Sequence, residues 1–156
     1  MKNKSFEGLQ NITIKTSYKK NGRACCMDPV RQKLVYATRE EIVRQKVLKY
    51  IMSNLSVPKD MISVEEPLSH YGVKTKDRAD IIVHSLDETH NELDPLVIIE
   101  CKAPEVILSS TDIDQVQGYA DRLSADYCVL VKDSRTIVLQ IYLHPVILFT
   151  GGFIKI

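Results

Sequence analysis

The sequence has no excess of either charge, which limits how it could attract a polyanion. Its 21 lysine and arginine residues against 20 aspartate and glutamate residues give a formal net charge of +1. Overall attraction of a nucleic acid requires a basic surface field, so any contact with DNA has to come from a local basic patch. The bulk charge therefore neither supports nor excludes a nucleic-acid substrate.

Long apolar runs are also missing. No stretch approaches the roughly 18 apolar residues of a membrane-spanning helix, and the polar residues 1–5 are not followed by the apolar core of a signal peptide. We therefore expect no membrane insertion, no secretion and a cytoplasmic location.

The cysteines do not have the spacing of a metal site. There are four of them, at Cys25, Cys26, Cys101 and Cys128, and no two pairs are separated as in zinc motifs. We expect reduced, mostly buried thiols.

The most informative stretch is residues 96–102, an apolar run that ends in Glu100, Cys101 and Lys102 before Pro104 stops it. Four unbroken apolar residues, three of them β-branched, predict a strand. Because side chains alternate along a strand, Leu96, Ile98, Glu100 and Lys102 share one face and Val97, Ile99 and Cys101 share the other. Burying an acid and a base beside a core is costly unless each has a partner or a task.

The tripeptide alone is weak evidence, because nine glutamates and fourteen lysines predict about one Glu-x-Lys in a chain of this length. Its position gives it weight. It ends the most apolar strand candidate, and a second acid, Asp80, precedes another apolar run at residues 81–83.

Two helices are expected. Thr38 followed three residues later by Glu41 is typical of a capping box, and the apolar spacing predicts a helix from there to about residue 54 or 55. Glu40 lies within the apolar stripe, where it either pairs with Arg44 one turn later or points into an active site. Residues 109–111 cap a second helix, over about 112–123, which places Gln115 and Tyr119 on one face.

The remaining segments complete a mixed α/β domain. Residues 1–36 form an N-terminal extension with a weak strand at 11–15, a turn at Asn21-Gly22 and a short strand at 33–36. Residues 37–143 form the main domain, in the order helix, three strands, helix, two strands. Residues 144–156 are an apolar tail: a closing strand, a contact surface or an altered terminus.

The acids suggest metal chemistry. Asp80 and Glu100 would lie on adjacent strands, and two carboxylates with the main-chain carbonyl of Cys101 form a hard oxygen site suited to Mg²⁺ or Mn²⁺. Such a metal polarises a phosphodiester and lowers the pKa of a bound water, while Lys102 positions that water and offsets charge on the phosphate. The predicted reaction is hydrolysis of a nucleic-acid backbone.

This arrangement resembles the PD-(D/E)xK nuclease superfamily, and more closely the N-terminal nuclease domain of type I restriction enzyme R subunits. The resemblance is carried by five ordered blocks, at residues 28–33, 38–45, 78–83, 99–104 and 115–119. It implies a restriction-endonuclease-like αβββαβ core, with a central mixed sheet flanked by helices, and a metal-dependent DNA endonuclease.

By the same resemblance, Asp80 and Glu100 bind metal, Lys102 is catalytic, and Gln115 and Tyr119 support the site. The superfamily often adds a glutamate from the first helix, here Glu40 with Glu41 as the second choice. It also implies DNA, other restriction-modification subunits and a second copy of the chain as partners. No G-x-x-x-x-G-K-[ST] motif is present, so this chain alone is not the ATP-driven translocase of that family.

Other hypotheses remain. The fold could serve as a DNA-binding or assembly module with little cleavage, or as a stand-alone resolvase or repair nuclease that prefers branched DNA. The scattered histidines, His70, His84, His90 and His144, are expected to be surface or structural residues. The basic residues Lys74, Lys76 and Arg78 either contact phosphates or form a solvated loop.

Overall fold

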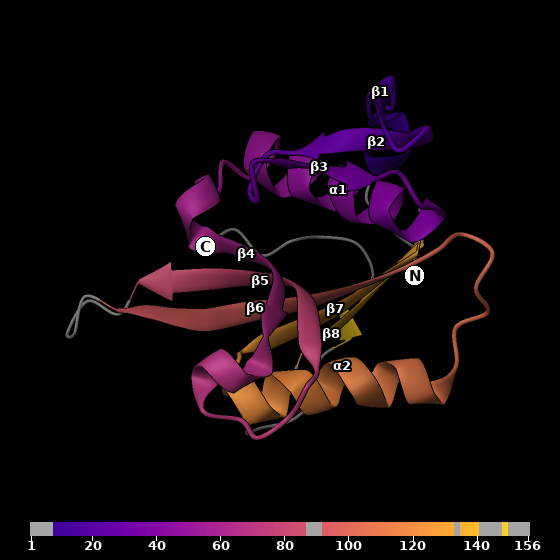
Figure 1. The fold of residues 1–156 in the computed structure, drawn as a ribbon. Helices are drawn as coiled ribbons and strands as arrows, with labels where there is room; N and C mark the ends of the chain where they lie inside the picture. The colour runs from indigo at the N-terminus through magenta and orange to yellow at the C-terminus, as the bar shows by residue number, and fades with distance from the viewer. Residues whose placement is uncertain (1–7, 87–91, 133–134, 141–147, 150–156) are drawn as a thin grey trace.

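The computed structural model describes residues 8–86, 92–132, 135–140 and 148–149. Within these ranges the chain forms two α-helices, three short 3-10 helices and two β-sheets (Figure 1). The elements run in the order η1 (Leu9–Asn11), β1 (Tyr18–Lys20), β2 (Arg23–Asp28), β3 (Lys33–Tyr36), α1 (Arg39–Ser53), η2 (Lys59–Met61), β4 (Ile62–Pro67), η3 (Leu68–Tyr71), β5 (Arg78–Leu86), β6 (Leu93–Lys102), α2 (Ser110–Leu123), β7 (Tyr127–Lys132), β8 (Arg135–Gln140) and β9 (Leu148–Phe149).

The N-terminal segment contains a small antiparallel sheet in the order β1-β2-β3. The turn predicted at Asn21-Gly22 is confirmed, and both residues have the positive φ that a tight hairpin turn requires. The strand expected at residues 11–15 is wrong: η1 covers the start of that stretch and β1 begins only at Tyr18. Alternation over five residues was too short a signal to outweigh the local turn at Leu9–Asn11.

The larger sheet has the strand order β4-β5-β6-β7-β8-β9, with neighbours antiparallel except for the parallel pair β6 and β7. The predicted sequence of a helix, three strands, a helix and two strands is confirmed. A parallel pair needs a crossover connection, and α2 supplies it.

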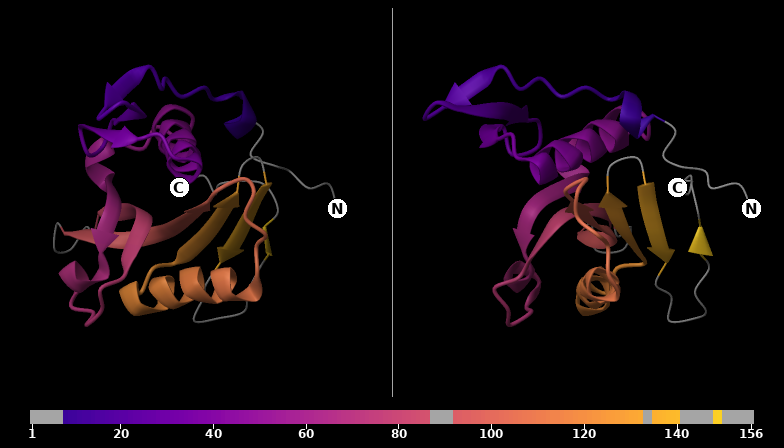
Figure 2. Two further views of the ribbon diagram at one scale, coloured as in Figure 1. Left: turned by 45° about the vertical axis from the view of Figure 1, so that its right-hand side comes forward. Right: turned by 90° about the vertical axis from the view of Figure 1, so that its right-hand side faces the viewer.

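The two helices cover opposite faces of this sheet (Figure 2). Apolar residues of α1, such as Val47 and Ile51, pack with Val97, Ile99 and Cys101, whereas α2 packs with the face that includes Ile98. The predicted alternation of faces along β6 therefore holds from Val97 onward. Leu96 departs from it, because it packs against the α1 side, close to the register shift between β5 and β6.

The helix N-termini are capped by the predicted residues. Thr38 Oγ1 accepts from the amide of Glu41, but the reciprocal half of the expected capping box is wrong, because the Glu41 carboxylate bonds to arginine and glutamine side chains instead. At α2, the box is complete: Ser109 and Asp112 bond to each other in both directions. Each cap satisfies amide groups that the helix itself leaves without partners.

The C-terminal tail lies mostly outside the described residues. Its one described piece is β9, which pairs with β8 as a closing strand. Residues 141–147 and 150–156 lie outside the described ranges, as does His144.

Candidate functional site

Asp80 and Glu100 lie side by side on neighbouring strands, as the sequence predicts. The antiparallel register pairs Ile81 with Ile99, so one further step along both strands places Asp80 opposite Glu100. The amide of Cys101 donates to Asp80 Oδ2 at 2.7 Å, and the amide of Asp80 donates to Glu100 Oε1 at 3.4 Å. Backbone groups of β5 and β6 therefore hold both carboxylates at one point on the sheet.

The Glu100 carboxyl is buried, with 5% of the residue exposed. Burial, and next the negative charge of Asp80, raise its pKa to about 9, although the nearby positive charge of Lys102 acts in the opposite direction. A carboxyl in this position is neutral at pH 7 unless a further cation joins it. A cation bound beside Glu100 would therefore lower the pKa of this carboxyl.

Lys102 extends from the end of β6 on the same face as Glu100 and reaches the start of α2. Its Nζ lies 3.5 Å from Asp112 Oδ1, and 18% of its side chain is exposed. Asp112 at the same time accepts from the Ser109 amide and hydroxyl through Oδ2. The sequence did not predict this contact, which places the lysine ammonium beside the N-terminus of α2.

The two candidate glutamates of α1 have different surroundings. Glu40 is partly exposed and lies 3.7 Å from Arg44, so the predicted ion pair is present. Burial and then the charge of Asp80 raise the pKa of Glu40, while Arg44 and Lys102 lower it. Glu40 is therefore close enough to be affected by the charge of Asp80, whereas the Glu41 carboxylate accepts from Arg31, Gln45 and Arg44.

Arg44 was predicted only as a partner of Glu40, and its contact with the acid pair was missed. Its guanidinium is buried and contacts Asp80 Oδ1 at 2.7 Å, Glu65 Oε1 at 2.7 Å, the Glu41 carboxylate and, at longer range, Glu40. Burial alone would lower the pKa of Arg44, but the charges of Asp80 and Glu41 outweigh this and raise it. Arg44 is a permanent cation that faces four carboxylates.

Glu65 was also not predicted. It has φ of 55°, a conformation uncommon for residues other than glycine, and the register places it opposite Asp80 on the other side of β5. A signal for Arg44 was available, since it lies beside the apolar stripe of a helix where a charge needs a partner. No comparable signal pointed to Glu65.

Gln115 and Tyr119 lie together on α2, as expected from their spacing. Gln115 Nε2 donates to the Tyr119 hydroxyl at 2.8 Å, and Tyr119 is buried against the sheet. Burial raises the pKa of Tyr119, and the charge of Glu100 adds to this effect. The pair therefore lies on the sheet face that carries Glu100.

The histidines and thiols of the described residues have structural surroundings. His84 is buried, bonds to Ser63 and stacks on Tyr71, and His70 is exposed and pairs with Glu66. His90 lies outside the described residues. All four cysteines are buried and free, as predicted. The basic residues Lys74, Lys76 and Arg78 are exposed.

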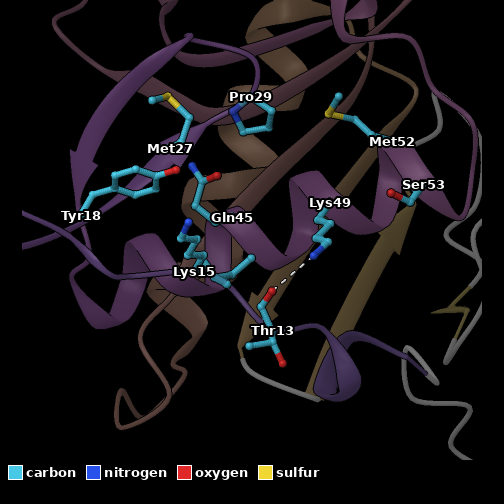
Figure 3. A pocket seen from close by; sticks show the side chains of 10 residues that line it. Thr13, Lys15, Tyr18, Met27, Pro29, Gln45, Lys49, Met52 and Ser53 are labelled. Atoms are coloured by element: carbon cyan, nitrogen blue, oxygen red, sulfur yellow. Dashed lines mark hydrogen bonds between the residues drawn. The ribbon is translucent and has the colours of Figure 1, made fainter.

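A cavity of about 360 Å³ lies between the N-terminal segment, the small sheet and α1 (Figure 3). Its wall includes Lys15, Tyr18, Met27, Gln45 and Lys49. None of the residues predicted for the site lines it.

The donor set at the acids fits a hard cation. In the described part of the chain no group of three or more His, Cys, Asp or Glu side chains is arranged to hold a metal, so an ion here would have two carboxylates and complete its shell with a carbonyl, water or phosphate oxygen. Mg²⁺ is commonly bound in that way. The Cys101 thiol is buried in the core on the α1 side, which leaves its main-chain carbonyl as the group that could take part.

The fold and this site define a class: a mixed α/β domain with a buried acid pair and a lysine at the end of a sheet strand. The family model described as type I restriction enzyme R protein N terminus matches residues 39–147, which cover most of the chain. The chain belongs to this family. No curated protein and no solved structure gives a significant match to it. None of the helices in the described ranges combines the length and apolar character needed to cross a membrane.

Proposed function

We propose that the chain is a metal-dependent endonuclease that hydrolyses phosphodiester bonds of DNA, with a restriction-endonuclease-like core of the PD-(D/E)xK type. One observation carries the proposal: Asp80 and Glu100 are adjacent, largely buried carboxylates, and the lysine of the same strand follows two residues later. Family membership supports it. The charge balance supports it as well, because Arg44 already has its own set of carboxylates and, among the residues that the structure describes, no cation forms an ion pair with Glu100.

Asp80 and Glu100 would hold Mg²⁺ or Mn²⁺ in this proposal. When bound, the ion would polarise the phosphodiester and lower the pKa of a coordinated water. Asp80 is fixed for this role by the Cys101 amide on one oxygen and by Arg44 on the other. Glu100 would ionise as the ion binds, because a neighbouring cation favours the carboxylate form.

Lys102 would act on the phosphate. Its ammonium group can donate to the attacking water or to a phosphate oxygen, and its charge offsets the negative charge that develops there. In the structure the Lys102 ammonium lies 3.5 Å from Asp112 Oδ1. Gln115, with Tyr119 as its anchor, would contact the substrate backbone, and Glu40 would take part from α1.

The test is cleavage of supercoiled plasmid with Mg²⁺ or Mn²⁺ by wild type, Lys102→Ala and Lys59→Ala. Lys59 is an exposed lysine of η2, so its variant controls for the loss of one positive charge. We expect wild type and Lys59→Ala to nick the plasmid, and Lys102→Ala to be at least about 100-fold slower. Equal cleavage by all three proteins would indicate a contaminating nuclease and would refute the assignment.

A second candidate is a DNA-binding or assembly module with little cleavage. The observation that favours it is the Arg44 contact, since an internal cation already neutralises part of the charge of Asp80. DNA binding without cleavage by wild type would support this alternative, and preference for a four-way junction over linear duplex would support a resolvase. The proposed partners are DNA, other restriction-modification subunits and a second copy of the chain, and the proposed location is the cytoplasm.

A further inference from the structure

The small N-terminal sheet is joined to α1 by a buried carboxylate. Asp28, the last residue of β2, is fully buried. Its Oδ1 accepts from the amides of Val30 and Arg31, and its Oδ2 accepts from Arg31 Nε at 2.8 Å and from Gln45 Nε2 at 2.8 Å. One side chain thus closes the turn between β2 and β3 and binds the helix.

Glu41 receives the same two donors on the helix side. Its Oε1 accepts from Arg31 Nη2 at 2.8 Å and from Gln45 Nε2 at 2.9 Å, and its other oxygen accepts from Arg44. Arg44 then donates to Asp80 Oδ1 at 2.7 Å. An unbroken chain of hydrogen bonds between charged or amide side chains therefore runs from the N-terminal sheet to the acid pair.

These hydrogen bonds lie in the buried interior of the protein, where they are strong. Asp28, Glu41, Arg44 and Asp80 are each at most 9% exposed, and hydrogen bonds to charged groups are strongest where water is excluded. Each member has partners on both sides, so none can rotate without breaking a bond to the next. The first two residues of this series of hydrogen bonds, Asp28 and Arg31, precede residues 39–147, which the family model matches.

We propose that this set, Asp28, Arg31, Gln45, Glu41 and Arg44, is a positioning relay that holds Asp80 in its working orientation, and that the N-terminal sheet is consequently part of the catalytic apparatus. The expected effect on the rate of cleavage rests on the proposed function. The expected effect on the orientation of Asp80 does not depend on that function.

The structural test uses the Cys101 amide, which donates to Asp80 and so reports the orientation of that carboxylate in a ¹H–¹⁵N spectrum. In Asp28→Asn one acceptor oxygen is replaced by a donor, which cannot satisfy the donors that surround it. We expect the Cys101 amide resonance to move in Asp28→Asn and in Arg44→Lys. Cys25→Ala, which removes a different buried side chain of β2, should leave it in place. An unmoved Cys101 resonance in a folded Asp28→Asn protein would overturn the relay.

The kinetic test measures plasmid cleavage per folded molecule across a Mg²⁺ titration. We expect Asp28→Asn to lower the maximal rate about 10-fold or more and to raise the half-saturating Mg²⁺ concentration, as loss of a residue behind a metal ligand does. The double variant with Arg44→Lys should be no slower than Arg44→Lys alone, because both changes interrupt one path. Multiplicative losses would contradict the relay, whereas absence of cleavage by wild type would count against the proposed nuclease and leave the resonance test decisive.

Discussion

The buried carboxyl of Glu100 makes a specific prediction about stability and pH. In the folded chain its pKa is raised to about 9 from the ordinary value of 4.5. Between these two pH values the folded state binds a proton that the unfolded state has released. Stability should therefore fall as the pH rises through this window, by up to a factor of ten in the unfolding constant for each pH unit.

The size of this loss of stability follows from the pH range between the two pKa values of Glu100. From pH 5 to pH 7 the contribution of Glu100 amounts to a loss on the order of 3 kcal/mol, taken as an upper bound. Glu100→Gln has no carboxyl to titrate and keeps a similar shape. Its free energy of unfolding should thus decline less with pH than that of wild type, and the variant should be the more stable protein at pH 7 to 8.

The assay is urea unfolding at pH 5, 6, 7 and 8, followed by far-UV circular dichroism because the chain has no tryptophan. Glu92→Gln, a change at an exposed glutamate near the start of β6, serves as the matched control and should follow wild type. Millimolar Mg²⁺ should flatten the wild-type slope and leave Glu100→Gln unaffected. Parallel slopes for wild type and Glu100→Gln would show that the carboxyl is already ionised at pH 5 and would refute the argument from burial.

Three further outcomes are expected. Arg44→Met removes the partner of several buried carboxylates and should lower the free energy of unfolding by about 3–5 kcal/mol; a loss below about 1 kcal/mol in urea titration would contradict the ion pairs. Tyr119→Phe deletes the hydroxyl that accepts from Gln115 and should cost about 1 kcal/mol, with a change in the melting temperature as the readout. Burial raises the pKa of Cys128 to about 12 and that of Cys101 well above its usual range. A thiol reagent at pH 8 should therefore react with these two thiols only after unfolding, and rapid labelling of the native protein would disprove their burial.

The elements that carry their own local signal could be predicted from the sequence. The caps at Thr38 and Ser109 marked where α1 and α2 begin, and continuous apolar runs marked β5 and β6. Since the pairing of adjacent strands follows from short connections, the juxtaposition of Asp80 with Glu100 could be predicted as well.

The contacts that join distant parts of the chain could not be predicted in the same way. Arg44 and Asp80 are 36 residues apart, and nothing in either local sequence identifies the other as its partner. The sequence did not predict that the N-terminal segment forms a three-stranded sheet. Its strands are short, and β2 buries two consecutive residues, Cys25 and Cys26, instead of following an alternating pattern. The periodicity of apolar residues shows which face of a helix or strand is buried. It says little about which charged side chains from distant segments come into contact.

The pleat of β6 has a consequence for chain-length variation around the acids. Glu100 and Lys102 project from the same face only because they are two residues apart, so a single residue inserted between Glu100 and Lys102 would turn the lysine toward α1. The connection at residues 103–109, between β6 and α2, is under no such rule and could lengthen without reversing either side chain. Among related chains, we therefore expect the spacing from glutamate to lysine to be invariant, while the distance from lysine to the following helix varies freely.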